Sequence, residues 1–141
     1  MRQAPRKSTR RAAAKCKDAR SASLTIRIDF GAFGFLGPGK IQLLELIAKH
    51  GSISAAGKEM GMSYRRAWLL VDEINHIFRK PLVETQMGGA GGGGAQVTKF
   101  GQEVIRRYRA IQQAAAEASD AHVRALVACL AETPRVLEEN A

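Results

Sequence analysis

Hydrophobic and polar positions alternate near the start of the chain and then change to a helical period. Between Ser23 and Phe30, apolar residues occupy every second position, which predicts a half-buried β-strand. Residues 31–39 form a turn region rich in glycine, and its apolar residues predict a second short strand that pairs back on the first. Residues 40–50 predict a helix, with apolar side chains at Ile41, Leu44, Leu46, Ile47 and Ala48, closed by Gly51 just past its end.

Residues 51–78 predict two short helices joined by a tight turn. Ser52 or Ser54 is suited to cap the first helix, since a serine hydroxyl accepts a hydrogen bond from a first-turn N–H. Gly61 supplies the turn, because glycine adopts backbone conformations that other residues resist. Ser63 is the expected cap of the second helix. Its apolar positions recur at i, i+3, i+4 and i+7, which predicts one buried stripe made of Ala67, Leu70, Val71, Ile74 and Phe78.

The opposite face of this second helix carries the candidate chemistry. At 100° per residue, Arg65 and Leu69 lie away from the buried stripe, with Tyr64, Arg66 and Trp68 beside them. A helix-turn-helix presents such a face to the major groove of DNA. The same stretch also fits an ordinary helical hairpin with a solvated basic end, so both interpretations stay open. Trp68 fits packing on the shoulder of the helix better than contact with DNA.

A glycine-rich hairpin follows the second helix. Pro81 ends the helical pattern, and the residues on either side of the glycine run Gly88–Gly94 favour short strands. Directly after a recognition helix, such a hairpin predicts a wing, whose glycines let the main chain approach DNA phosphates. A loop that touches nothing is the alternative. A nucleotide-binding P-loop is excluded, because Ala95 and Gln96 stand where the G-x-x-x-x-G-K-[ST] pattern requires Lys and Ser or Thr.

The pattern after Thr98 is helical again. Val104, Tyr108, Ile111 and Ala115 recur at close to heptad spacing, and a second apolar stripe continues toward Glu132 before Pro134 stops it. These predicted helices carry more apolar surface than the small body needs, which favours dimerisation. Packing of the same helices against their own domain is the competing explanation.

Basic charge is concentrated at the start of the chain. Residues 1–22 hold eight of the 22 Lys and Arg and one of the 13 Asp and Glu, so they carry +7 of the formal net charge of +9. This segment predicts a disordered arm attracted to phosphate, or a solvated tail with no role. The folded body is almost neutral, so its function has to be inferred from local sites.

Other chemistry is not indicated by the sequence. Cys16 and Cys129 are far apart, and neither they nor the three histidines resemble a metal-ligand set. No carboxylate pair or nucleophile with its base stands out, so we expect no enzyme activity, no metal and no cofactor. The sequence has no apolar run of about 18 residues, and its start lacks the apolar segment of a secretory signal. The absence of both segments favours a cytoplasmic protein. We further expect a bacterial or archaeal source and association with the nucleoid.

The motif Gly61-Met62-Ser63-Tyr64-Arg65-Arg66-Ala67-Trp68, with the preceding Ser52-x-x-Ala55-Ala56 and the glycine run, resembles the ModE family of molybdate-dependent transcriptional regulators. The resemblance covers about residues 24–108. LysR-type regulators share the Ser-x-x-Ala-Ala pattern, but not the Tyr-Arg-Arg-Ala-Trp helix. The resemblance implies a winged helix-turn-helix that dimerises and binds promoter DNA. Full-length members carry molybdate-binding β-barrel modules after this domain; here helices continue toward Ala141, so we expect the DNA-binding domain only.

Together these features predict a mainly α protein with small β, namely a winged helix-turn-helix with an N-terminal strand pair and C-terminal dimerisation helices. We expect a basic arm at residues 1–22, the DNA-binding domain at 23–98, a helical dimerisation segment at 99–132 and a tail at 133–141. The recognition helix is expected at about 63–78 and the wing at 85–98.

The predicted function is transcriptional regulation by a homodimer on a pseudo-palindromic operator, with the effector unidentified. The alternative is a protein–protein adaptor that keeps the fold without sequence-specific DNA binding. The residues expected to contact DNA are Ser52, Ser54, Ser63, Tyr64, Arg65, Arg66, Leu69, Gly91 and Gly92. Those expected at the dimer interface are Val104, Tyr108, Ile111 and Ala115.

Overall fold

The computed structural model describes residues 21–86 and 94–135. The predicted basic arm lies almost wholly outside these ranges, as do the tip of the predicted wing and the last six residues. The chain divides into two units, residues 25–113 and residues 1–24 with 114–141. The elements are β1 (Ile28–Asp29), a 3₁₀ turn η2 (Gly31–Phe33), β2 (Phe35–Leu36), α2 (Pro38–His50), α3 (Ile53–Glu59), α4 (Tyr64–Asn75), β3 (Val83–Gln86), β4 (Gly94–Val97) and α5 (Lys99–Val127).

The predicted N-terminal strand pair is confirmed, but it is much shorter than the alternation of residues suggests. Only Ile28 and Asp29 pair with β2, in an antiparallel register that sets Ile28 opposite Leu36. Strand β2 ends at Leu36 because helix α2 begins at Pro38, so the residues before Ile28 have no strand to pair with. The predicted alternation of side chains persists nonetheless, since Ile26, Ile28 and Phe30 are half-buried and the residues between them are exposed.

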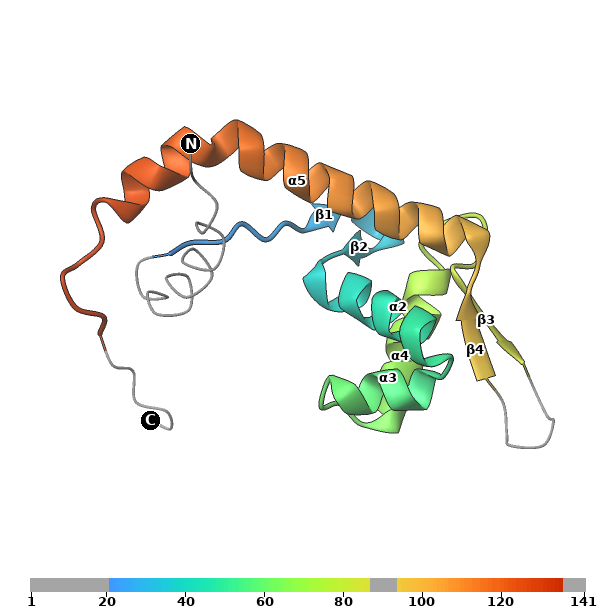
Figure 1. Cartoon of the computed structure of the whole chain (residues 1–141). Coiled ribbons are helices and arrows are strands. Elements are labelled where there is room, and N and C mark those ends of the chain that lie inside the picture. Colours follow the sequence, from blue (N-terminus) through green and yellow to red (C-terminus); the bar gives the residue numbers. More distant parts are fainter. Residues whose placement is uncertain (1–20, 87–93, 136–141) are drawn as a thin grey trace, which may run out of the picture. The chain divides into compact units, whose positions relative to one another are not determined.

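Helix α2 is the centre of the core in the unit of residues 25–113. Ile41, Leu43, Leu44 and Ile47 are completely buried, whereas Ala48, predicted to be on the apolar face, is exposed. The helix contacts α3, α4 and β4, so its buried arc is wider than a single stripe. Gly51 ends it in the left-handed conformation, as predicted, with φ of 69°. In Figure 1 α2, α3 and α4 lie together, and the β3–β4 hairpin lies beside them.

The C-terminal helical segment is one continuous helix, not several. Helix α5 runs from Lys99 to Val127 without a glycine or proline after Gly101, and an alanine-rich stretch favours its continuity. It ends five residues before Glu132, and turns follow. No helix in the described parts of the chain is long and apolar enough to cross a membrane.

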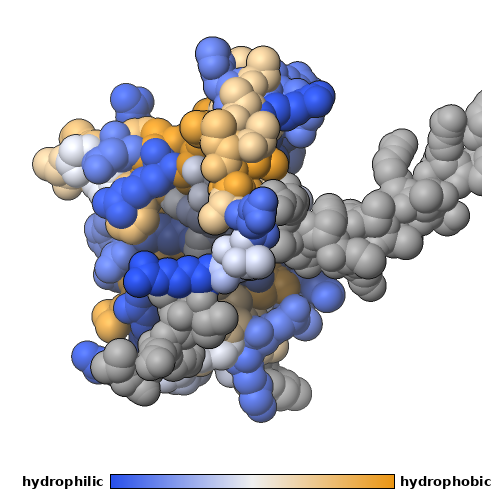
Figure 2. Space-filling view, turned by 90° about the vertical axis from the view of Figure 1, so that its left-hand side faces the viewer, coloured by the Kyte–Doolittle hydropathy of each residue, from blue (hydrophilic) through white to orange (hydrophobic). Residues whose placement is uncertain are grey.

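Hydrophobic side chains also reach the surface. Figure 2 shows them gathered in patches between hydrophilic side chains on the face turned to the viewer. The large ones with the greatest exposure include Phe33, Tyr64, Leu69, Ile111 and Leu126. Two of these belong to α4 and two to α5, which makes these helices the first places to look for a partner surface.

Candidate nucleic-acid interface

Two serine caps begin the helices of the predicted helix-turn-helix. The Ser52 hydroxyl accepts a hydrogen bond of 3.0 Å from the Ala55 N–H and begins α3. The Ser63 hydroxyl accepts one of 3.1 Å from the Arg66 N–H and begins α4. Of the two serines expected as caps of the first helix, Ser52 has this role, whereas Ser54 lies within α3 and is exposed. Each capping hydroxyl keeps its own hydrogen as a donor.

A close approach between α3 and α4 fixes their relative position. A Cβ added to Gly57 would lie 2.8 Å from the Ala67 Cβ and 3.4 Å from Met62 Cγ, so the two helices meet where neither carries bulk. The turn between them passes through Gly61 with φ of 75°, in the left-handed region that glycine favours, as predicted. Sequence reasoning missed Gly57, although its small size one turn from Gly61 was an available signal.

Helix α4 turns one side into the core and the other to solvent. Ala67, Val71 and Ile74 are buried against the rest of the domain, as the periodicity predicted. Phe78 lies beyond the end of the helix at Asn75 and is only half-buried, so the predicted stripe and the predicted helix are both too long by three residues. Phe78 instead meets Phe30 and Phe100 edge-on, with ring centroids 5.6 Å apart in each pair.

The exposed side of α4 brings together the residues predicted to contact DNA. Tyr64 and Leu69 are 62% and 49% exposed, and Arg65 and Arg66 are also exposed. In the ranges that the structure describes, no carboxylate forms an ion pair with either arginine. Trp68 is 38% exposed and its ring meets that of Tyr64 edge-on, with centroids 6.0 Å apart. Within those ranges, one end of α4 therefore offers two guanidinium groups without a carboxylate partner, beside aromatic and aliphatic surface.

The hairpin after α4 is attached to it by one side chain. The Asn75 carbonyl oxygen accepts hydrogen bonds from the N–H groups of Leu82 and Val83, at 2.8 and 3.0 Å, and its amide donates to the Val83 carbonyl. The Ala95 N–H donates to the Gly51 carbonyl at 3.0 Å, which ties β4 to the end of α2. Asn75 thus fixes the start of the hairpin at the last residue of the helix. Sequence reasoning missed this role, because a polar residue at a helix end gives no sign of its distant partners.

The hairpin itself has the predicted form, with β3 and β4 paired antiparallel from Val83 opposite Val97 to Gln86 opposite Gly94. Gly91 and Gly92, predicted near the DNA backbone, lie outside the described residues. Beyond the hairpin, Thr98 begins α5, since its hydroxyl donates to the Pro81 carbonyl and accepts from the Gly101 N–H, each at 2.9 Å. The base of the wing is therefore held to both α4 and α5.

The residues predicted at the dimer interface are in different environments. Val104 and Tyr108 are 8% and 1% exposed in their own domain, and the Tyr108 hydroxyl donates to the Ile26 carbonyl at 2.7 Å. Ile111 is 47% exposed, and Ala115 is half-buried. Ile111 lines a mostly apolar cavity of about 250 Å³, together with Phe30, Phe78, Phe100 and Tyr108, among others. The intramolecular packing that the sequence left open thus applies to Val104 and Tyr108.

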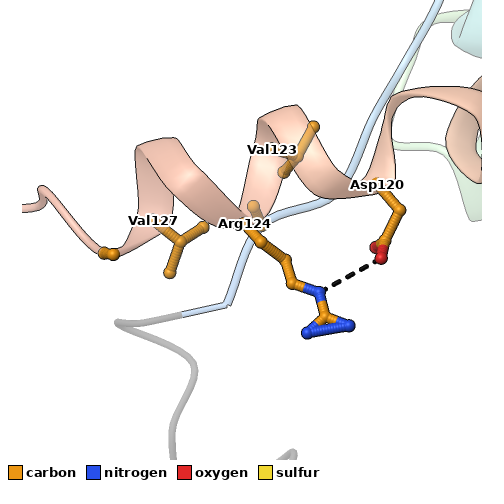
Figure 3. Close-up of a pocket in the computed structure, with 6 residues that line it drawn as sticks. Asp120, Val123, Arg124 and Val127 are labelled. Carbon is orange, nitrogen blue, oxygen red and sulfur yellow. Dashed lines mark hydrogen bonds and ion pairs between the residues drawn. The ribbon is translucent and has the colours of Figure 1, made fainter.

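A second hollow lies in the unit of residues 1–24 and 114–141. It has a volume of about 360 Å³ and is lined by Ala22, Val123 and Val127, with Asp120 and Arg124 at its edge. Figure 3 shows that Arg124 turns to Asp120, and its Nε donates to an Asp120 oxygen at 3.1 Å. Asp120 and Arg124 thus pair with each other, so neither offers an unpaired charge to a ligand in the hollow. Over the described ranges no group of three or more His, Cys, Asp or Glu is placed to hold a metal ion.

The chain matches no protein-family model, but it is similar to several individual proteins. The DNA-binding transcriptional dual regulator ModE of Escherichia coli K12 is 43% identical over 86 residues, which is 61% of this chain and 33% of the relative. The molybdenum-pterin-binding protein MopA of Rhodobacter capsulatus is 43% identical over 83 residues, or 59% of this chain and 31% of the relative.

The molybdenum transport protein ModE of Azotobacter vinelandii is 37% identical over 91 residues, or 64% of this chain and 33% of the relative. Over about 60% of its length, this chain is a relative of the ModE proteins. The resemblance expected from the recognition-helix motif is therefore confirmed. The matched segment spans about a third of each relative named here.

Proposed function

We propose that the chain is a DNA-binding transcriptional regulator that acts as a homodimer on a pseudo-palindromic operator. The observation that carries the proposal is the exposed end of α4, where Arg65 and Arg66 have no carboxylate partner among the described residues while the opposite side of the helix is buried. The relationship to proteins named as transcriptional regulators supports it. The relatives' names describe binding, transport and regulation, which supports our inference that the chain is not an enzyme.

In the proposed complex, α4 enters the major groove with its N-terminal end leading. Arg65 makes a bidentate contact to guanine, Leu69 meets a thymine methyl group, and Tyr64 and Arg66 reach phosphate or base. Ser52, Ser54 and Ser63 lie in or at the start of α3 and α4, where hydroxyl and N–H groups bind phosphate. Gly91 and Gly92 are proposed to approach the DNA backbone from the wing. Recognition is therefore assigned to α4 and positioning to the elements around it.

Arg65→Ala tests the recognition helix. Loss of a bidentate base contact should cost about 1–3 kcal/mol on the cognate site and relax the preference at one base position. Fluorescence anisotropy with a site selected from genomic fragments, repeated over a range of salt concentrations, measures both effects. Arg106→Ala is the matched control, because Arg106 is an exposed arginine on α5 that pairs with Glu103. Equal loss on random DNA would assign Arg65 to phosphate.

The homodimer is proposed to form on the α5 surface around Ile111, with Ala115 beside it. The exposed Ile111 side chain and the adjoining apolar cavity offer a surface that a second copy would cover. Val104 and Tyr108 are buried in their own domain, so in this proposal they pack beneath the dimer surface and do not contact the partner. Two copies then present two recognition helices, as a pseudo-palindromic operator requires.

Ile111→Asp tests the dimer. A carboxylate placed in an apolar interface is costly, so sedimentation should give a folded monomer whose operator binding is weakened. Ala110→Asp is the matched control, since it adds the same charge to an exposed position on the neighbouring face of the helix. A variant that stays dimeric at micromolar concentration would move the interface elsewhere.

The rival function is a protein–protein adaptor that keeps the fold without binding an operator. The exposed side of α4 carries Tyr64 and Trp68 beside Leu69, which favours an adaptor because aromatic side chains are enriched at protein interfaces. Salt-dependent binding to genomic fragments separates the two functions. An operator-binding regulator prefers particular fragments, whereas an adaptor binds none of them above random DNA.

A further inference from the structure

A further cavity lies beside the proposed recognition helix, on the flank of α4 that carries Arg66. Its volume is about 320 Å³, and its wall includes Arg27, the first turn of α2 with Lys40, and Arg66 and Leu70 of α4. The size is at the lower end of the range for small-molecule sites in proteins. None of the residues assigned to base recognition lines it except Arg66, which therefore belongs to both surfaces.

Three cations from three separate segments line this cavity. Lys40 is only 5% exposed, and its ammonium group lies 3.1 Å from the Phe35 carbonyl and 3.4 Å from a Glu73 oxygen. The same ammonium group also lies 3.7 Å from the centroid of the Phe35 ring, so Lys40 adds positive potential to the cavity but no free donor. Arg27 pairs with Asp29 only at 3.9 Å, with both side chains largely exposed, which makes a weak interaction. Arg66 has no carboxylate partner in the same ranges.

The backbone of α2 adds further donors to the same wall. Gly37 begins the helix without a side-chain cap, and Gly39 and Lys40 line the cavity. Pro38 has no N–H, so the first-turn donors of α2 that lack an acceptor within the helix are the N–H groups of Gly39 and Lys40, where the helix dipole adds positive potential. Two carboxylates near the cavity, Asp29 and Glu73, do not balance three cations and these donors. The cavity is therefore suited to an anion.

The rest of the wall is apolar. Phe35, Met62 and Leu70 line it and are half-buried. The Phe35 ring is contacted by both basic side chains, with Lys40 Nζ and Arg27 Cζ each 3.7 Å from its centroid. A bare oxyanion such as sulfate or molybdate would leave this apolar wall in contact with water. A ligand with an anionic group and a flat apolar body would cover both parts.

We propose that this cavity binds a small aromatic carboxylate and that the bound carboxylate draws Arg66 away from DNA. The second half of this proposal rests on the proposed function, in which Arg66 contacts DNA. Binding at the two surfaces is then competitive for one side chain, so the ligand weakens DNA binding and DNA weakens ligand binding by the same factor. The cavity thereby becomes an effector site built into the DNA-binding domain.

The test of ligand binding adds 1-naphthoate to the full chain. Binding is measured by calorimetry and by the changes in amide chemical shifts. We expect saturable binding with shifts at Gly39, Lys40 and Met62. Sulfate, molybdate and the uncharged 1-naphthylmethanol should each bind at least about tenfold more weakly. Arg27→Gln and Arg66→Gln should weaken binding by about fivefold or more, since each removes a charge-assisted contact. Arg79→Gln, an exposed arginine that does not line the cavity, should leave binding unchanged.

The test of coupling measures the affinity for a selected DNA site with and without 1-naphthoate. The probe should weaken DNA binding by the wild-type chain several-fold, and the effect should shrink in Arg27→Gln, which keeps Arg66. If the chain bound naphthoate but no DNA, the proposed function would be rejected while the proposed ligand site would stand. Shifts around Phe100 and Tyr108 in place of those at Gly39, Lys40 and Met62 would contradict the proposed ligand site. Sulfate binding as tight as that of naphthoate would also contradict it.

Discussion

Helices α4 and α5 both carry an apolar stripe, but the chain covers these stripes to different extents. In α4 the inward residues Ala67, Val71 and Ile74 are at most 3% exposed. In α5 Tyr108 is equally buried, whereas Ile111 is 47% and Leu126 is 70% exposed. The apolar stripe of α4 is therefore covered within the molecule, and the opposite side, with its two arginines beside aromatic and aliphatic side chains, is available to a partner. In α5 part of the apolar stripe itself is available.

This difference implies two kinds of partner. A polar helix face with arginines that lack carboxylate partners in the described ranges suits a polyanion, because the attraction is electrostatic and the helix needs no rearrangement to present it. An exposed apolar stripe suits another apolar surface, since covering it removes hydrophobic area from water. The proposed DNA contact of α4 and the proposed dimer contact of α5 follow these two principles.

The greatest loss of stability is expected from the buried stripe of α4. Ile74→Ala removes a completely buried side chain from α4 and should lower the free energy of unfolding by about 2–5 kcal/mol. Leu126→Ala is the counterpart in α5, where the side chain is 70% exposed, and should change it by less than about 0.5 kcal/mol. Denaturant unfolding of the two variants at low protein concentration, where a dimer dissociates, measures the contrast. Similar losses would mean that Leu126 is covered in solution.

A smaller effect is expected where α3 supports α4. Gly57→Ala places a methyl group 2.8 Å from the Ala67 Cβ, so the helices must separate, at a cost of about 1–3 kcal/mol. Gly39→Ala in the first turn of α2 is the matched control, since a Cβ there meets nothing within 4 Å and should be neutral or slightly stabilising. Thermal unfolding of both variants is the measurement. If Gly57→Ala left the stability unchanged, the contact between α3 and α4 would be looser in solution than in the structure.

The smallest effect concerns an ion pair between helices. A hydrogen bond of 2.6 Å from His50 Nε2 to Glu59 lowers the pKa of this carboxyl below its ordinary value of 4.5 and joins the ends of α2 and α3. A lowered pKa in the folded state means that the contribution to stability is present above 4.5 and is lost as pH falls through the lowered value. Glu59→Gln should therefore reduce the acid sensitivity of unfolding as the pH falls below 4.5.

The matched control for this pH effect is Asp120→Asn. Asp120 pairs with Arg124 in the same helix, so its substitution removes no contact between different elements. Unfolding by urea at a series of pH values compares the two variants. A pH profile of Glu59→Gln that coincides with that of the wild type would show that the contact with His50 does not persist in solution.

The order and type of the elements, and the face of α4 that is exposed, follow from local patterns in the amino-acid sequence. Those features depend on local properties: the periods of two and 3.6 residues, the serine caps and the glycine turns act within a few residues of each other. The roles of Ser63, Gly61 and Gly51 therefore follow from their immediate neighbours in the chain. The ModE resemblance was also carried by a contiguous motif, residues 61–68, which needs no knowledge of distant contacts.

The tertiary structure alone decided which apolar surfaces the chain covers itself. The hydroxyl of Tyr108 reaches the carbonyl of Ile26, 82 residues away in sequence, and this contact buries a residue that the heptad spacing had assigned to a dimer. The hydrogen bonds of Asn75 to the wing and the close packing of Gly57 against Ala67 also depend on the tertiary structure, because in each case the partner belongs to another element. The cavity between Arg27, Lys40 and Arg66 exists only once three separate segments meet. Periodicity specifies a face of a helix, but what packs against that face depends on the whole fold.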